Sequence, residues 1–239
     1  MNNLKALSKV GEGKSKIIYT DGVSTYLEFK GDVRCSSHIE KYDEEIAKIR
    51  AQMTCLLFDY LSQEIDGVAK AELIEPKIIK METLDPLPLE WIPRYIAAGS
   101  VVKRFGFKKG HVFNKLVLKI DYKTDMDDYL ITDELIIEKG ILNKKELEKA
   151  KKLVYSIAGS LKNLFLSKGL KLWDFKLELG INPYTRQIKL IDEISFDGMR
   201  LKDANTEESF DKDIYRETGS IDAVIKAYRQ GFNRLFGVL

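Results

Sequence analysis

The stretch LWDFKLELGINPYTRQIKLIDEIS, residues 172–195, joins two apolar runs through a turn. In its first half, apolar residues alternate strictly with Asp174, Lys176 and Glu178. Successive side chains of a β-strand point to opposite faces, so the alternation predicts one strand with an apolar core face and a charged face. Neighbouring charges on that face stand about 6.5–7 Å apart.

The second half of this stretch returns after the turn NPYTR, residues 182–186. A symmetrical closure of this five-residue loop would pair Glu178 with Leu190 and Lys176 with Asp192. Asp192 then shares a face with the charged residues of the first strand.

Carboxylates on two adjacent strands are suited to Mg²⁺, which takes hard oxygen ligands together with water and phosphate oxygens. A register slip of one residue would present Glu193 in place of Asp192. The alternative is a solvated sheet face with cross-strand charge pairs. The apolar neighbours of Asp192 favour the metal hypothesis, because a carboxylate at the end of an apolar row is costly unless it is paired or metal-bound.

Composition narrows the class of protein. The chain has 239 residues, and 39 Lys and Arg against 37 Asp and Glu give a net charge of +2, which argues against a nucleic-acid coat protein. No apolar run approaches the roughly 18–20 residues of a membrane span. Two cysteines without CxxC spacing predict neither a disulfide framework nor a zinc site, and favour a cytoplasmic location. With only two histidines, any catalysis would depend on carboxylates and cations.

The prolines mark a change in organisation. Four of the five lie between residues 76 and 93, and the stretch LDPLPLEWIP, residues 84–93, reads as an extended connector because proline disfavours helix. We place a domain boundary there, with an N-terminal domain over residues 1–83 and a C-terminal domain over residues 84–239.

Periodicity predicts the elements of both domains. Strands without regular βαβ alternation, beside long helices, predict an α+β fold. A capping box at Asn143 and Glu146 marks one helix start. The predicted strands are 16–20, 25–29, around 73–75, around 77–81 and 116–122, and the predicted helices are 39–66, 143–167 and 220–236.

The segment GEGKSKIIY, residues 11–19, is a candidate phosphate-binding turn. It is not a P-loop, because Ser8 stands where that motif needs its first glycine and the following residues continue as strand. A glycine-rich turn at Gly13 could approach phosphates closely, with Lys14 and Lys16 supplying charge. A plain basic hairpin is the alternative.

The segment PRYIAAGSVVKRFG, residues 93–106, is a second candidate. Arg94 precedes a possible helix start at Ser100, and small residues between them would leave room for a phosphate group. An ordinary capped helix with a basic surface is the alternative. Further isolated cations follow at Arg200, Lys212 and Arg216.

Taken in order, five segments from about residue 7 to 236 resemble the signature blocks of the SAICAR synthetase family. The resemblance implies an ATP-dependent ligase of purine synthesis that joins the carboxylate of carboxyaminoimidazole ribonucleotide (CAIR) to the amine of L-aspartate, with an acyl phosphate as intermediate. The segments are EGKSK (12–16), PLEWIPRYIAAGSVVKRFG (88–106), WDFKLELG (173–180), DEISFDGMRLKD (192–203) and DKDIYR (211–216).

The same resemblance implies a kinase- and ATP-grasp-like fold, in which a small β-rich domain covers a larger α+β domain with ATP between them. It also implies Mg²⁺, CAIR and L-aspartate as ligands, and assembly as dimers or larger particles. Glu178 and Asp192 would hold Mg²⁺. The residues implied at ATP are Gly13, Lys14, Lys16 and Leu84.

The resemblance further implies a substrate pocket. Asp174 and Lys176 would act in catalysis beside the imidazole and ribose. The remaining substrate-binding residues would be Arg94, Ser100, Asp197, Arg200, Lys212 and Arg216.

Some segments depart from the family pattern. A loop resembling DxTAGDG and a following KGxxN are replaced by DVRCSSHIE, residues 32–40, and IAKIRAQ, residues 46–52. Tyr95 and Phe196 replace a typical asparagine and proline. We therefore expect the aspartate pocket to differ most. A kinase-like transferase for another acceptor and a non-catalytic ATP-binding homologue stay open as alternatives.

Overall fold

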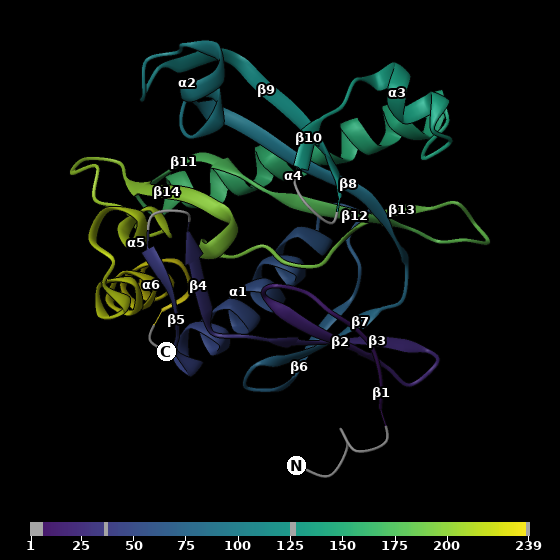
Figure 1. The fold of residues 1–239 in the computed structure, drawn as a ribbon, viewed down its shortest axis with the longest axis horizontal. Coiled ribbons are helices and arrows are strands. Elements are labelled where there is room, and N and C mark those ends of the chain that lie inside the picture. Colours follow the sequence, from purple (N-terminus) through teal and green to yellow (C-terminus); the bar gives the residue numbers. More distant parts are fainter. Residues whose placement is uncertain (1–6, 36–37, 125–127, 238–239) are drawn as a thin grey trace.

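Two antiparallel sheets make up most of the computed structural model, which describes residues 7–35, 38–124 and 128–237. In Figure 1 the N-terminal sheet lies below and the C-terminal sheet above it. The N-terminal sheet has the order β1-β2-β3-β7-β6. Its strands are β1 (Ser8–Glu12), β2 (Lys16–Thr20), β3 (Ser24–Phe29), β6 (Ala71–Glu75) and β7 (Ile78–Glu82).

Helix α1 (Glu44–Ser62) packs against this sheet, and its start corrects the predicted helix over residues 39–66. Residues 38–42 form strand β5 (His38–Tyr42), which pairs with β4 (Asp32–Cys35). Asp43 ends the strand and caps the helix, because its side chain accepts a hydrogen bond from the backbone N–H of Glu45 at 2.8 Å. Apolar residues of the hairpin happened to match the helical spacing.

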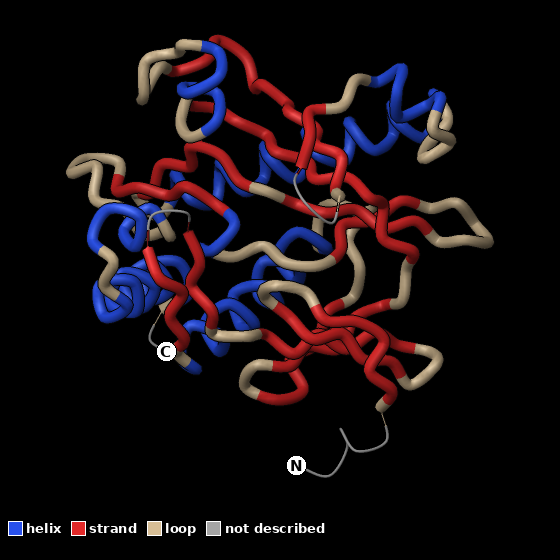
Figure 2. The backbone as a smooth tube through the Cα atoms, viewed as in Figure 1, coloured by secondary structure: helices blue, strands red, loops and turns tan. Residues whose placement is uncertain are grey.

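The C-terminal sheet has seven strands, with β10-β9-β8-β11-β14 as its main path and β12 joining β13 to β8. Helices surround it, as Figure 2 shows. The strands are β8 (Asp85–Ile96), β9 (Val112–Lys123), β10 (Asp128–Leu130), β11 (Leu170–Phe175), β12 (Leu177–Ile181), β13 (Ile188–Ile191) and β14 (Met199–Asp203). The helices are α2 (Ser100–Phe105), α3 (Asp133–Glu138), α4 (Lys144–Ser167), α5 (Asp213–Thr218) and α6 (Ile221–Phe236), with a 3₁₀ turn at Phe196–Gly198.

Strand β8 corrects the predicted connector. The segment is extended, as its prolines require, but it pairs with β9 on one side and with β11 and β12 on the other. Leu89 and Trp91 on this strand are fully buried, so apolar side chains between the prolines anchor the strand in the sheet. The domain boundary near residue 83 stays a prediction. The chain changes sheets there, while one apolar core continues through both.

Helix α4 confirms the predicted capping box. The Asn143 side chain accepts from the backbone N–H of Glu146 at 3.0 Å, and the Glu146 carboxylate accepts from the backbone N–H of Asn143 at 2.9 Å. Val154, Ile157 and Leu161 on the same helix are fully buried, and the helix contacts β8, β11 and β13. The mixed architecture is the predicted α+β class.

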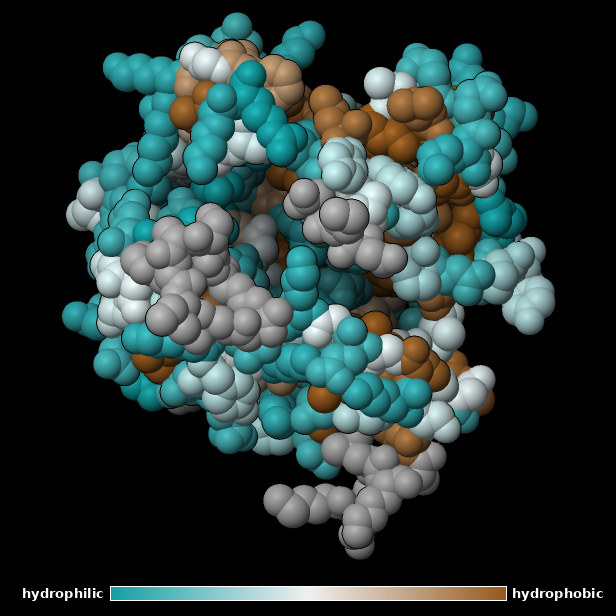
Figure 3. Space-filling model, viewed as in Figure 1, coloured by the Kyte–Doolittle hydropathy of each residue, from teal (hydrophilic) through white to brown (hydrophobic). Residues whose placement is uncertain are grey.

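The surface facing the viewer in Figure 3 is mainly hydrophilic around a central recess. Across the described part of the chain, no helix is both long and apolar enough to span a membrane.

Candidate active site

The charged stretch LWDFKLEL, residues 172–179, belongs to two strands rather than the predicted one. Strands β11 and β12 are separated at Lys176, whose backbone N–H donates to the carbonyl of Gly198 at 2.8 Å. Asp174 is only 2% exposed and Glu178 only 7% exposed. A freely solvated sheet face does not describe these carboxylates, which are buried among cations.

The pairing of β12 with β13 differs by one residue from the predicted register. Glu178 lies opposite Ile191, not Leu190, and Ile181 lies opposite Ile188. The loop has four residues, 183–186, in place of the predicted five, because the backbone N–H of Asn182 donates to the carbonyl of Gln187 at 2.8 Å and closes it. Arg186 at its end takes a left-handed backbone with φ of 58°.

Asp192 nevertheless reaches the predicted cluster, and so does Glu193. The Nζ atom of Lys16 lies 2.8 Å from Asp192 Oδ1 and 2.8 Å from Glu193 Oε2. Regular alternation would send adjacent side chains to opposite faces. Asp192 has a φ of 68°, and this left-handed residue breaks the alternation at the end of β13. The two carboxylates that the sequence offered as alternatives are therefore both present.

Lys176 and Glu178 form the centre of the cluster. Glu178 accepts hydrogen bonds from Lys176 at 2.9 Å and from Lys123 at 2.7 Å. Burial acts to raise the pKa of Glu178, but the two ammonium groups outweigh it and hold that pKa at about 2. Lys176 also donates to Glu90 at 3.2 Å. Glu178 is thus ionised at neutral pH.

Asp192 belongs electrostatically to the same centre. Burial acts to lower the pKa of Lys176, but Glu178 and Asp192 raise that pKa well above its usual value. Within residues 7–35, 38–124 and 128–237, no three His, Cys, Asp or Glu side chains are grouped closely enough to hold a metal ion. A metal bound by Glu178 and Asp192 would need its other ligands from water or substrate.

The residues of the glycine–lysine turn differ in their exposure and in their distance from the cluster. Lys16 is buried on β2 and faces the cluster, whereas Gly13 and Lys14 are exposed in the turn between β1 and β2. Leu84 is buried at the junction of β7 and β8. A Cβ atom added at Gly180 would lie 2.9 Å from the Cβ of Leu84, so the glycine permits close approach of β12 to this junction.

A second charge cluster gathers Arg94 and Arg200 around Asp174. Asp174 forms an ion pair with Arg94, and both of its oxygens accept from Arg200 Nη1 at 3.0 Å. The Arg94 guanidinium also donates to the carbonyl of Ala98 at 2.7 Å. These contacts suit Asp174 to positioning the two arginines, and its catalytic role stays a prediction.

Gly99 and Ser100 lie at the same cluster. Ser100 opens α2, as predicted, but the capping position belongs to Gly99, which has a φ of 59°. A Cβ atom at residue 99 would lie 2.9 Å from Arg200 Nη2, so only a glycine allows the arginine to pack against this turn.

The remaining predicted residues form two further contacts. Arg200 Nε donates to Asp213 at 3.1 Å, and Arg216 forms an ion pair with the same carboxylate. Lys212 donates to Asp197 Oδ2 at 2.9 Å. The buried Oδ1 atom of Asp197 has no hydrogen-bond partner among the residues that the structure describes.

Several residues of these clusters escaped prediction as site residues. Glu90 and Lys123 could have been found from strand parity once β8 and β9 were known to pair. Arg50 gave no local signal, because its partner Glu193 is 143 positions away in the sequence. Asp213 lies in the segment DKDIYR between the predicted cations Lys212 and Arg216, and it pairs with Arg200 and Arg216.

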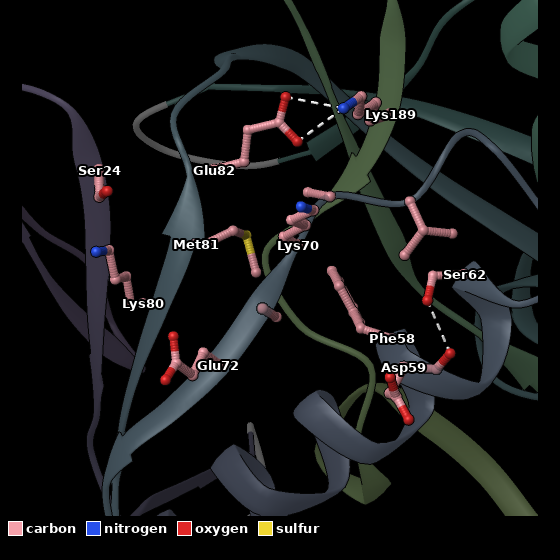
Figure 4. A pocket seen from close by; sticks show the side chains of 13 residues that line it. Ser24, Phe58, Asp59, Ser62, Lys70, Glu72, Lys80, Met81, Glu82 and Lys189 are labelled. Carbon is pink, nitrogen blue, oxygen red and sulfur yellow. Dashed lines mark hydrogen bonds and ion pairs between the residues drawn. The ribbon is translucent and has the colours of Figure 1, made fainter.

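A cavity of about 760 Å³ lies apart from these clusters, and none of the predicted site residues lines it. Figure 4 shows Phe58 and Ser62 of α1 on one side and Met81 of β7 on the other. Lys189 crosses from β13 to Glu82, with Nζ–O distances of 2.8 and 2.7 Å. The volume of this cavity is therefore no guide to the position of the charged site.

Known proteins match this chain over nearly its whole length. The SAICAR synthetase family model matches residues 9–235. A phosphoribosylaminoimidazole-succinocarboxamide synthase from Staphylococcus epidermidis is 37% identical over 236 residues, which cover 96% of this chain and 98% of that protein. The crystal structure of the enzyme of that name from Ehrlichia chaffeensis has a TM-score of 0.91 at 30% identity, covering 97% of this chain and 100% of that one. A type-2 SAICAR synthetase in complex with ADP has a TM-score of 0.87 at 29% identity, covering 95% and 97%.

Proposed function

This chain belongs to the SAICAR synthetase family, and we infer from that membership that it is a phosphoribosylaminoimidazole-succinocarboxamide synthase, an ATP-dependent ligase of purine biosynthesis. At the level of the site, the inference is supported by two charge clusters on the C-terminal sheet, the first of which also receives Lys16 from the N-terminal sheet. Lys16, Lys176 and Glu178 gather near the N-terminal sheet. Arg94 and Arg200 gather around Asp174 farther along.

The reaction needs this kind of site. A carboxylate is a poor acceptor for an amine, so the γ-phosphoryl group of ATP is first transferred to the carboxylate of CAIR, giving an acyl phosphate and ADP. The amine of L-aspartate then attacks the acyl carbon, loses a proton and expels phosphate. Such transfers depend on alignment and charge neutralisation more than on a strong general base. Lys16, which is buried, and Lys176, which is half-buried, are suited to neutralising the transferred phosphoryl group.

Glu178 and Asp192 are the residues that would hold Mg²⁺. Both are oxygen donors, and the ionised Glu178 already attracts two ammonium groups. Two carboxylates fit Mg²⁺, which commonly keeps waters and phosphate oxygens in the rest of its octahedral shell. The ion would supply charge stabilisation for the nucleotide phosphates.

The second cluster would hold the phosphate of CAIR. The Arg94 and Arg200 guanidinium groups are fixed by one carboxylate, and planar guanidinium forks bind phosphate oxygens well. Ser100 would add a hydroxyl, while Asp197, Lys212 and Arg216 would face the rest of the substrates. ATP would lie between the two sheets, with Gly13 and Lys14 over its phosphates and Leu84 beside the adenine. Assembly into dimers or larger particles stays a prediction.

A coupled assay tests this function. The chain is incubated with ATP, Mg²⁺, CAIR and L-aspartate, and both ADP and the succinocarboxamide product are followed. We expect one ADP for each product molecule, with sustained ADP release only when both acceptors are present. ADP release that CAIR does not stimulate, or that leaves aspartate unincorporated, would indicate a kinase-like transferase for another acceptor. Nucleotide binding without turnover would indicate a non-catalytic homologue.

A further inference from the structure

Arg50 is a fully buried arginine on α1, a helix of the N-terminal part of the chain. Its Nε and Nη2 atoms each donate to the Glu193 carboxylate at 2.8 Å, and its Nη1 atom donates to the carbonyl of Lys30 at 2.8 Å. The guanidinium carbon also lies 5.4 Å from the centre of the Phe29 ring. All three nitrogen atoms are thus engaged, and two of them hold one carboxylate in a bidentate pair.

Glu193 is shared between Arg50 and the predicted phosphate-binding lysine. Its Oε2 atom accepts from both Arg50 and Lys16 at 2.8 Å, and its Oε1 atom accepts from Arg50 and from the hydroxyl of Ser195. The Glu193 side chain is only 9% exposed, and its carboxylate is in direct contact with two cations.

Lys16 cannot keep its present ion pairs and also contact the phosphates of a bound nucleotide. Its single ammonium group contacts both Asp192 and Glu193 in this structure. Under the proposed function, the same group must turn toward the phosphates of ATP while Asp192 takes Mg²⁺. Glu193 would then lose one of its two cations, and a buried carboxylate without a partner is strongly unfavourable.

We propose that Arg50 is a positioning residue for the nucleotide site, holding Glu193 so that Lys16 is free to leave this carboxylate and face the ATP phosphates. The inference rests on the proposed function. Arg50 is suited to this task because its bidentate pair stays intact when Lys16 moves. Thr54, one turn along α1, adds a hydrogen bond to the carbonyl of Ile194 at 3.4 Å, so the helix also holds the backbone next to Glu193.

Calorimetric titration with Mg²⁺ and the non-hydrolysable ATP analogue AMP-PNP tests the proposal without requiring turnover. We expect Arg50→Gln to weaken binding about tenfold or more, because Lys16 becomes the main counter-ion of Glu193 and is held there. The double variant Arg50→Gln/Glu193→Gln should bind within about threefold of the unchanged protein, since the carboxylate that retains Lys16 is gone.

Leu57→Ala is the matched control for a loss of packing on the same helix, because Leu57 is also fully buried on α1. It should lower the unfolding temperature and leave analogue affinity unchanged. If Arg50→Gln does not fold, Arg50→Lys takes its place, because it keeps the charge but not the two parallel bonds, and about threefold weaker binding is expected.

Three results would overturn the inference. They are unchanged affinity in the Arg50 variant, equal losses in the Arg50 and Leu57 variants, and a double variant no better than Arg50→Gln. Failure of the unchanged protein to bind the analogue would instead overturn the proposed function, and this inference with it.

Discussion

Glu178 is the carboxylate at the centre of the first charge cluster. Two lysines neutralise it, and its pKa of about 2 means that it stays ionised well below neutral pH. Mg²⁺ binding would therefore exchange one set of cations for another around an existing anion, with no proton to remove first.

Glu178→Gln tests this assignment. The substitution keeps the size of the side chain and removes its charge, so we expect the Mg²⁺-dependent rate to fall about a hundredfold or more. Circular dichroism should show a folded protein. Steady-state kinetics across a Mg²⁺ titration give the measurement.

The control is Glu28→Gln on β3. Glu28 is also paired, with Tyr19 at 3.0 Å and Lys77 at 3.1 Å, but those partners lie outside both charge clusters. Its turnover should be normal. Near-normal activity of Glu178→Gln at ordinary Mg²⁺ concentrations would contradict the metal assignment.

At the scale of residues, the sequence shows which side chains alternate along a strand. It does not show which residues take an unusual backbone conformation or which distant residues they contact. Alternation correctly placed Lys176 and Glu178 together, but it wrongly placed Asp174 with them, since Asp174 pairs with Arg94 and Arg200. It could not show the left-handed φ of Asp192, because aspartate also fits ordinary strands. The contact of Arg50 with Glu193 was equally hidden, since it depends on how a helix docks against a distant strand.

At the scale of elements, α6 is held against the Phe196 turn by a glycine. A Cβ atom added at Gly231 would lie 2.8 Å from the Phe196 ring. Phe196 is fully buried, and its ring centre lies 5.2 Å from that of Tyr228. The ring cannot withdraw without disturbing the turn that carries Asp197.

Gly231→Ala should therefore destabilise the protein by about 1–3 kcal/mol, because overpacking outweighs the helix-forming advantage of alanine. Gly159→Ala in α4 is the matched comparison, since a Cβ atom there meets no neighbour within 4 Å. It should stabilise the protein by up to about 1 kcal/mol. Urea unfolding of both variants measures the two changes, and equal shifts in one direction would refute this account of α6 packing.

Local signals predicted those elements whose limits are set locally. The capping box fixed the start of α4, and Ser220 caps α6 within one residue of the predicted start. The predicted helix over residues 39–66 was only partly right. Its first residues pair with β4 in a hairpin, and no local pattern reveals that pairing. The prolines of β8 correctly predicted extended backbone but said nothing of the two strands that flank it.

At the scale of the whole molecule, the core does not follow the change of sheet at residue 83. One apolar cluster includes Phe29 and Ile46 from the N-terminal part and Leu179 and Phe232 from the C-terminal part. Helix α1 contacts β6 on one side and α6 on the other. Local sequence patterns could not predict that these distant segments pack into one core. The order of the elements was enough to predict the fold class.

We expect one cooperative unfolding transition, because neither sheet can lose its packing without exposing the shared core. Scanning calorimetry should give equal calorimetric and van't Hoff enthalpies. Two resolved transitions, with the N-terminal sheet melting first, would show that the core contacts between the two parts are weak.

Strand β8 has a consequence for substrate choice. It carries Glu90 beside the first charge cluster and Arg94 in the second, four residues apart and hydrogen-bonded to neighbours on both sides. At about 3.3 Å per residue, that spacing is about 13 Å. If the two clusters hold the substrate as proposed, the strand would fix how far the reacting carboxylate lies from the phosphate. A shorter or longer substrate could contact only one cluster at a time and would bind more weakly, even if it carried the same functional groups.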